Sequence, residues 1–334
     1  MLATPSTYTI AAPDGRALDI PATVDRDHDP YPSLESGPAI RRYYEEQGYV
    51  VVRVVVPTQL CDDVRRAFAD EVKPYRGFIY RQTTGNPERH EMTAHGHVLN
   101  PVLNIQDLSA EMFPRFRSHG LAILTHGNVQ RVVEALFGMP GKIVQTMYFE
   151  GNPATWAHQD TYYLDAEKIG RMAAAWIAVE DINPGAGRFY VYPRSHLIDI
   201  ARNGGDFDIA FHHDRYKSLV LDLIDRFKLE CRAPALAKGD VLFWNSKTIH
   251  GSLETRQPEH SRSSFTAHWL PLNQNLLQFQ SRVRQLDLKF IDGVAIHHPK
   301  DLNVFKNRAV MFVETTFPAA FRLAKKVAIK AMLR

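Results

Sequence analysis

The sequence predicts an α+β protein whose core is an antiparallel β-barrel or sandwich backed by helices. Helical patterns dominate the first part of the chain, up to about residue 138. From Lys142 onward, β-rich segments recur and are separated by turn signals such as the stretch NPGAG. Helices early and strands late, with turns between successive strands, indicate this fold class.

Composition places the chain among soluble globular proteins. Its 334 residues are 45% hydrophobic and 23% charged, which suits one large domain, and a formal net charge of +3 gives no nucleic-acid signal. Cys61 and Cys231 lack CxxC spacing, which suits a reducing compartment and supplies no thiolate metal site. No apolar run approaches the roughly 20 residues of a membrane span, and the first residues do not resemble a signal peptide. We therefore expect a cytoplasmic location.

The N-terminal segments alternate between arm, helix and strand. Residues 1–36 are rich in Pro, Asp and Ser and are expected to form a surface arm, with a short hairpin around residues 12–15. A helix is predicted over Ala39–Gln47, because Gly48 then interrupts the pattern and a β-branched strand follows until Pro57. This switch marks the start of the folded domain.

The middle of the chain contains two further helical patterns and one long irregular segment. A helix beginning at Thr58 has apolar residues at four-residue spacing, and another helical stretch is predicted over residues 119–138. Between them, residues 76–107 mix Gly, Pro, Asn and His without a period, as in functional excursions. This segment is either a lid over a substrate or a solvated loop.

These segments predict one domain over residues 37–315. A helical insertion near residues 200–230 interrupts the strands, and residues 316–334 form a basic amphipathic tail. The tail suits either an anionic membrane surface, contacted through residues 321–334, or a solvated terminal helix. The sequence leaves both open, together with the oligomeric state.

A histidine and an aspartate two positions apart carry the first chemical signal. In the stretch TWAHQDTYYL, His158 and Asp160 would share one face of a strand, while Gln159 points away. A hydrophobic strand ending in GDVLFWNSKTIHGS supplies His250 as a third ligand. Two histidines and one carboxylate leave coordination positions open, as in non-haem Fe(II) oxygenases, although the same set can hold catalytic zinc.

An arginine after the distal histidine separates the two metal interpretations. On a strand through SRSSFTAHWLP, Arg262 shares a polar face with Ser264, Thr266 and His268, while the alternate residues are apolar. A planar guanidinium matches a carboxylate bidentately, so Arg262 can anchor the far end of a dicarboxylic cosubstrate that chelates the metal. Zinc hydrolysis has no such requirement.

Taken together, these motifs resemble the phytanoyl-CoA dioxygenase family of Fe(II)- and 2-oxoglutarate-dependent oxygenases. The resemblance covers roughly residues 36–275 and rests on HQD, GRFYVYPRSH, GDVLFWNSKTIHGS and Arg262 six residues before His268, in this order. It implies a double-stranded β-helix, or jelly roll, and iron ligation by His158, Asp160 and His250. It also implies 2-oxoglutarate contacts, which fall on Arg262, Ser252, Trp176 and Gln145.

Two positions bear on the resemblance. The family's frequent Pro-Gly-Ser-His is Pro193-Arg194-Ser195-His196 here, so the turn lacks its glycine. Related halogenases replace the carboxylate ligand by a small residue, so Asp160 disfavours halogenation. For the substrate, strand alternation favours Tyr162, and the excursion offers Arg81 and His97.

The function expected from these observations is an Fe(II)- and 2-oxoglutarate-dependent hydroxylase. It would act on a small organic or lipid-linked molecule, consume O2, release succinate and CO2, and be stimulated by ascorbate. Desaturation, epoxidation and ring formation use the same apparatus. A zinc-dependent hydrolase with the same triad and a non-catalytic ligand-binding barrel remain as alternatives.

Overall fold

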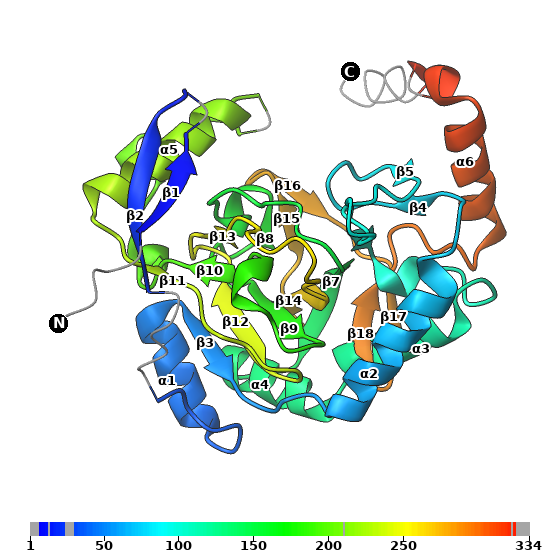
Figure 1. Cartoon of the computed structure of the whole chain (residues 1–334), viewed down its shortest axis with the longest axis horizontal. Helices are drawn as coiled ribbons and strands as arrows, with labels where there is room; N and C mark the ends of the chain where they lie inside the picture. Colours follow the sequence, from blue (N-terminus) through cyan, green and yellow to red (C-terminus); the bar gives the residue numbers. More distant parts are fainter. Residues whose placement is uncertain (1–6, 13, 24–29, 210, 322, 325–334) are drawn as a thin grey trace.

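The core of the molecule is a jelly roll made of two facing sheets. The computed structural model describes residues 7–12, 14–23, 30–209, 211–321 and 323–324. The larger sheet has the strand order β17-β18-β7-β14-β9-β12-β3, with β6 beside β7, and the smaller has the order β1-β2-β11-β10-β13. Figure 1 shows the strands at the centre and helices around them. The predicted α+β class and double-stranded β-helix are confirmed.

The elements have the following bounds. The larger sheet comprises β3 (Tyr49–Val52), β6 (Val102–Leu103), β7 (Gly141–Phe149), β9 (Ala173–Ala178), β12 (Val241–Asn245), β14 (Ser264–Pro271), β17 (Leu288–Ile291) and β18 (Val294–His297). The smaller comprises β1 (Thr7–Ala11), β2 (Ala17–Thr23), β10 (Phe189–Val191), β11 (Cys231–Arg232) and β13 (His250–Ser252). The short strands are β4 (Ile79–Tyr80), β5 (Pro87–Glu88), β8 (Leu164–Ala166), β15 (Leu276–Gln278) and β16 (Arg282–Arg284). The helices are α1 (Gly37–Gln47), α2 (Thr58–Ala67), α3 (Pro114–Leu124), α4 (Gly127–Phe137), α5 (His213–Arg226) and α6 (Phe305–Thr316).

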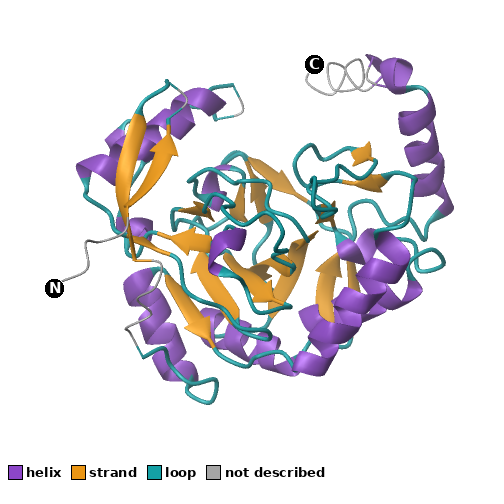
Figure 2. Ribbon diagram, in the orientation of Figure 1, coloured by secondary structure: helices purple, strands orange, loops and turns teal. Residues whose placement is uncertain are grey.

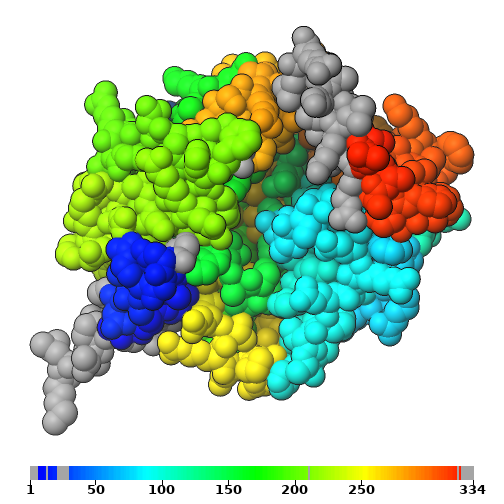
Figure 3. All heavy atoms as spheres, turned by 90° about the horizontal axis from the view of Figure 1, so that it is seen from above, coloured from blue at the N-terminus to red at the C-terminus, as the bar shows by residue number. Residues whose placement is uncertain are grey.

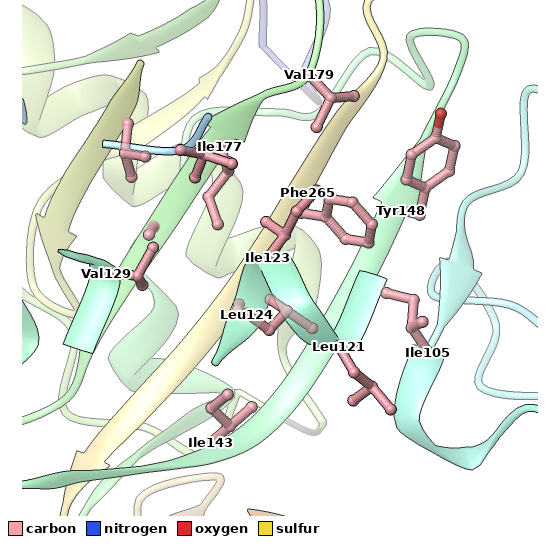
Figure 4. Packing of buried hydrophobic residues seen from close by; sticks show 14 of the residues in the cluster. Ile105, Leu121, Ile123, Leu124, Val129, Ile143, Tyr148, Ile177, Val179 and Phe265 are labelled. Carbon is pink, nitrogen blue, oxygen red and sulfur yellow. The ribbon is translucent and has the colours of Figure 1, made fainter. Parts of the chain in front are cut away.

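Strand alternation decides which residues of the larger sheet meet helices and which meet the interior. On β14, Phe265, Ala267 and Trp269 belong to the apolar cluster that includes residues of α1, α2, α3 and α4. Figure 2 shows helices, in purple, along the outside of the orange strands. Thr266 pairs with Trp176 of β9 and faces the other way. Figure 4 shows Phe265 beside Tyr148 of β7, with ring centroids 5.0 Å apart. The sheet is therefore buried on both faces, with helices on one and the functional cavity on the other.

The helical predictions need two adjustments. The stretch expected to be one helix over 119–138 is two helices, α3 and α4, separated at Thr125 and His126. The insertion near 200–230 contains α5, which packs with β1 and β2 in the second apolar cluster. The hairpin predicted around residues 12–15 is present, since β1 and β2 pair with each other, and β2 extends the smaller sheet by pairing with β11.

The segment with His158 and Asp160 is not a strand, which corrects the sequence interpretation. Only His158 forms a β-bridge, to His250, and Asp160–Tyr162 then form a turn of 3-10 helix. The hydroxyl of Tyr216 on α5 explains this break, because it accepts from the N–H of Gln159 at 2.7 Å and donates to the Gln159 carbonyl at 3.2 Å. Both backbone groups are thereby satisfied without a neighbouring strand.

The turn at residues 193–196 tolerates the loss of the family's glycine. Arg194 has a φ of 66°, in the left-handed region that favours glycine. Its N–H donates to the carbonyl of Gln47 at 2.8 Å, and its side chain is exposed. The arginine therefore lies at the surface of the barrel and does not line the cavity described below.

Candidate active site

The two histidines and the aspartate singled out in the sequence come together at one end of the jelly roll. The N–H of His158 donates to the carbonyl of His250 at 3.0 Å, and the reverse bond is 2.9 Å, so the two imidazoles lie side by side. The Oδ1 atom of Asp160 lies 3.6 Å from Nε2 of His158 and 3.5 Å from Nε2 of His250. The three ligand atoms lie within 4.8 Å of one another, which fits one metal ion.

Backbone carbonyls set the tautomer of both imidazoles. Nδ1 of His158 lies 2.7 Å from the carbonyl of Trp156, and Nδ1 of His250 lies 2.9 Å from the carbonyl of Thr248. A carbonyl can only accept, so each Nδ1 must carry the proton. The Nε2 lone pairs are therefore free and directed toward Asp160, as in metal sites whose second ring nitrogen is held by an outer partner.

Burial gives the site its protonation state. Asp160 and His250 are both buried. Burial lowers the pKa of His250 to about 4, because a charged imidazole loses its hydration there. Burial acts to raise the pKa of Asp160, but the facing imidazoles of His250, His268 and His158 outweigh it and hold that pKa well below its usual value. Near neutral pH the site thus presents a carboxylate and a neutral His250, the forms that bind a metal cation.

Arg262 is a buried cation on the same cavity. Its side chain is 2% exposed, its Nη1 donates to the carbonyl of Gly187 at 2.9 Å, and its Nε has no partner. Among the described residues, no carboxylate lies within 4.0 Å of the guanidinium, and burial lowers its pKa to about 9. A buried charge without a counter-ion is costly. The position therefore fits an anionic ligand.

The remaining residues proposed to contact 2-oxoglutarate lie around the same space. A cavity of about 610 Å³ joins the His-Asp-His cluster to Arg262, and Gln145, Trp176 and Ser252 line it. The Oγ of Ser252 accepts from the N–H of Thr155 at 2.7 Å, so its hydroxyl proton is available to a ligand. Trp176 stacks on Phe189 and lies 5.9 Å from the Arg262 guanidinium.

The residues predicted to contact substrate lie elsewhere, and these three predictions are corrected. Tyr162 is buried in the second apolar cluster, with its hydroxyl donating to the Gly205 carbonyl, because the 3-10 turn breaks the alternation. Arg81 is buried and donates to the carbonyls of Glu88 and Asn100. His97 contacts the carbonyl of Glu259 and does not line the cavity. From the excursion at residues 76–107, the cavity is lined by Gln82–Gly85.

Other residues of the site were missed. Tyr163, His213 and Lys217 line the cavity, the latter two from the first turns of α5. Trp244 donates its indole N–H to Oδ2 of Asp160, and His268 lies 3.5 Å from the same oxygen. Trp244 was missed because it lies in an unbroken hydrophobic run. His213 and Lys217 were missed because nothing in the sequence shows that α5 packs beside the site. The predicted position of His268, on the polar face of β14, is confirmed, because His268 lines the cavity.

The sequence profile of the Phytanoyl-CoA dioxygenase (PhyH) family matches residues 44–264. The chain belongs to the phytanoyl-CoA dioxygenase family. Human peroxisomal phytanoyl-CoA dioxygenase is 22% identical over 275 residues, which cover 76% of this chain and 74% of the human protein. A phytanoyl-CoA dioxygenase domain-containing protein 1 homologue from Caenorhabditis elegans is also 22% identical and covers 69% of this chain and 89% of its own length.

Solved structures of other proteins share the fold of this chain. The α-ketoglutarate-dependent carbocyclase SnoK from nogalamycin biosynthesis is similar with a TM-score of 0.54 and 19% identity, covering 74% of this chain and 89% of SnoK. EctD from S. alaskensis with bound Fe has a TM-score of 0.52 and 14% identity, covering 85% of this chain and 90% of EctD. At these identities the structures establish only the fold of this phytanoyl-CoA dioxygenase family member. The description of its site rests on the residues of this chain.

Proposed function

We propose that this chain is an Fe(II)- and 2-oxoglutarate-dependent dioxygenase that hydroxylates a small organic or lipid-linked substrate. The observation that carries the proposal is the buried Arg262 without a counter-ion, on the same cavity as His158, Asp160 and His250. A metal-chelating dicarboxylate is the ligand that would use both ends of this cavity at once. Among proteins with the same fold, EctD from S. alaskensis has been solved with bound Fe, and with 2-oxoglutarate and 5-hydroxyectoine.

Each residue has a defined part in this proposal. When bound, iron with 2-oxoglutarate and O2 supplies the oxidising chemistry, with succinate and CO2 as products and ascorbate as a stimulant. His158, Asp160 and His250 would hold the iron. Arg262 would bind the distal carboxylate bidentately, and the hydroxyl of Ser252 can donate to the same group. Trp176 and Phe189 form an apolar wall that keeps water from this end of the cavity.

The charges of the cavity favour an anionic substrate. Of the described residues that line it, histidines apart, Asp160, Arg262 and Lys217 carry formal charge. In this proposal Asp160 binds the metal and Arg262 binds 2-oxoglutarate. Lys217 is then the charged residue that remains for the substrate. It lies 5.5 Å from the centre of the Trp156 ring, and its contact with the exposed Asp214 is long, at 3.8 Å. We therefore propose that Lys217 contacts a carboxylate or phosphate of the substrate.

The alternatives account for less of the site. A zinc-dependent hydrolase needs the triad and a general base beside the metal-bound water, but it gives no role to the buried guanidinium of Arg262. A ligand-binding barrel without turnover explains the cavity but not three converging metal-competent side chains with fixed tautomers. Both alternatives predict that 2-oxoglutarate is not consumed.

Succinate formation tests the proposal directly. The metal-free protein is reconstituted with Fe(II) or Zn(II) and incubated with 2-oxoglutarate, ascorbate and candidate anionic substrates, and succinate and product masses are measured. We expect succinate from the Fe(II) protein but not from the Zn(II) protein, together with a product that has gained one oxygen atom. A product that has lost two hydrogens would instead indicate desaturation or ring closure. Substrate cleavage with Zn(II) and no succinate would establish the hydrolase alternative.

A further inference from the structure

The helix α6 presents its apolar residues outward. Among the residues of α6, Phe305 is 76% exposed and Phe312 is 64% exposed, and Val313 is exposed as well. None of the residues of α6 is buried. A surface helix normally turns such residues toward the core, so the orientation is the reverse of the usual one.

The inward side of the same helix carries the more polar residues. The polar residues Asn307, Glu314 and Thr315 are partly buried, together with Met311, and the four follow one another at helical spacing. Asn307 donates to the carbonyl of Asp301 at 3.0 Å, and Glu314 accepts from the hydroxyl of Tyr80 at 3.1 Å. Because these polar contacts fix the rotation of α6, the exposure of Phe305 and Phe312 is imposed by the fold.

The apolar surface continues beyond α6 and is accompanied by positive charge. Phe317 and Leu323 are also exposed, at 57% and 65%. From Phe305 to Arg334 the sequence has seven basic residues and one acidic residue, Glu314. The expected basic tail lies mostly outside the described residues, since 322 and 325–334 are not among them. Its sequence nevertheless gives this end of the chain an excess of cations.

The location of α6 relates this surface to the cavity. Through Tyr80 the helix contacts β4, and the β4–β5 turn, Gln82–Gly85, lines the cavity. Lys300, just before α6, donates to the carbonyl of Gly85 at 3.1 Å. In Figure 3, the red surface of α6 lies beside the cyan surface that borders a central hollow, with the yellow-green surface of α5 opposite.

We propose that the exposed face of α6, followed by the basic C-terminal residues, binds the surface of an anionic lipid bilayer. Aromatic side chains entering the interface, flanked by cations that meet anionic headgroups, are the features of helices that lie on a membrane. Among the described residues, no helix is both long and apolar enough to cross a bilayer. The binding is therefore peripheral, and it brings the rim of the cavity next to the lipid.

A vesicle experiment with the full chain tests this binding. The protein is sedimented with large vesicles of phosphatidylglycerol and phosphatidylcholine at equal proportions, and with vesicles of phosphatidylcholine alone. We expect association with the anionic vesicles that weakens as salt is raised, and little association with the neutral ones. Each of Phe305→Ser and Phe312→Ser should reduce the partition coefficient by about tenfold, since each removes an aromatic ring that the bound protein buries in the lipid.

Two controls make the outcome decisive. Phe290→Ser changes a phenylalanine on β17 whose exposure, 71%, lies between those of Phe305 and Phe312, and it should leave vesicle binding unchanged. Lys325→Glu with Lys326→Glu should abolish the preference for anionic vesicles. Equal binding by Phe305→Ser, Phe312→Ser and the wild type would overturn the proposal. So would a dimer in light scattering that Phe312→Ser dissociates, because the apolar face would then be covered by a second copy. None of these measurements depends on turnover.

Discussion

Trp244 donates its indole N–H to Oδ2 of Asp160 across 2.8 Å, and so decides which oxygen of that carboxylate faces the two histidines. Oδ1 is left toward the Nε2 atoms of His158 and His250. His268 lies near Oδ2 as well, at 3.5 Å. The carboxylate is therefore oriented before any metal arrives, by a residue that cannot itself be a ligand.

Replacing Trp244 by phenylalanine should weaken metal binding while leaving the fold intact. The substitution keeps an aromatic ring but removes the hydrogen bond that orients Asp160, and the loss of such an outer partner costs 10–100-fold in metal affinity. We expect a loss of about tenfold in Co(II) or Fe(II) affinity, measured by calorimetric titration of the metal-free protein.

Trp269 supplies the matched control for that measurement. It is also buried, but it faces the helices, and its indole nitrogen has no hydrogen-bond partner. Trp269→Phe should therefore lower stability modestly and leave metal affinity unchanged. Equal metal affinity for Trp244→Phe and the wild type would show that Asp160 is oriented without the indole.

Removing a member of the triad should abolish metal-dependent turnover. His158→Ala and His250→Ala each leave two protein ligands, so the metal is held weakly and out of place. For Asp160→Gly we expect loss of hydroxylation without chlorination, since an open position alone creates no halide site. Metal content and succinate formation are measured together. A variant that retains both would remove its residue from the site, and hydroxylation by Asp160→Gly would show that another carboxylate is the ligand.

The sequence predicted those parts of the site that follow from local periodicity. Thr266 on the inner face of β14 lies where strict alternation puts it, because a strand has a period of two. Arg262, two residues before the start of β14, lines the same cavity. The prediction that Tyr162 contacts the substrate was wrong because the chain is not a strand there. The hydroxyl of Tyr216, on a helix far along the chain, ends the extended conformation at Gln159 and turns Tyr163 to the cavity instead.

Long-range contacts account for the other residues that were missed. Trp244 lies on β12, which is buried on both faces and therefore shows no alternation that would mark one side as functional. Lys217 lies on α5, whose amphipathic pattern predicts a helix but not the element it packs against. The metal ligands could be predicted because His158 and Asp160 are two residues apart and His250 follows a hydrophobic strand.

The metal-free protein should lose stability as the pH falls from 6.5 to 4. Folded His250 has a pKa of about 4, lowered by burial from an ordinary value of 6.5, so in this window the unfolded chain binds a proton that the folded chain does not. Unfolding is then favoured by acid, and the penalty is complete below pH 4. Asp160 stays ionised across the window, since its pKa lies below it.

Chemical denaturation at several pH values measures this contribution. Between pH 7 and pH 4.5, we expect the free energy of unfolding of the wild type to fall by on the order of 2–3 kcal/mol more than that of His250→Gln. Identical pH profiles for the two proteins would mean that other groups carry the acid sensitivity. Bound metal should shift the decline to lower pH, because it competes with protons for the same nitrogen.

Arg262 should control the affinity for 2-oxoglutarate, and Arg256 should not. Arg256 also follows His250 in the sequence, but it is exposed, whereas Arg262 is buried beside the cavity. Removing a charge-assisted contact costs roughly 1.5–3 kcal/mol, so Arg262→Ala should weaken 2-oxoglutarate binding by about ten- to hundredfold. Arg262→Lys should also raise the concentration needed for half-maximal rate, because a bidentate contact becomes a single point. Iron affinity without cosubstrate should hardly change.

Thermal unfolding separates this role from a structural one. Without 2-oxoglutarate, Arg262→Ala should be as stable as the wild type or more stable, since it removes a buried cation that has no counter-ion. A ligand at a hundred times its dissociation constant stabilises the folded state by about 2.7 kcal/mol. Metal-loaded wild type and Arg256→Ala should both gain this increment from 2-oxoglutarate, and Arg262→Ala should lose most of it. If Arg256→Ala loses the increment and Arg262→Ala keeps it, the cosubstrate binds at the loop and the buried guanidinium has another partner.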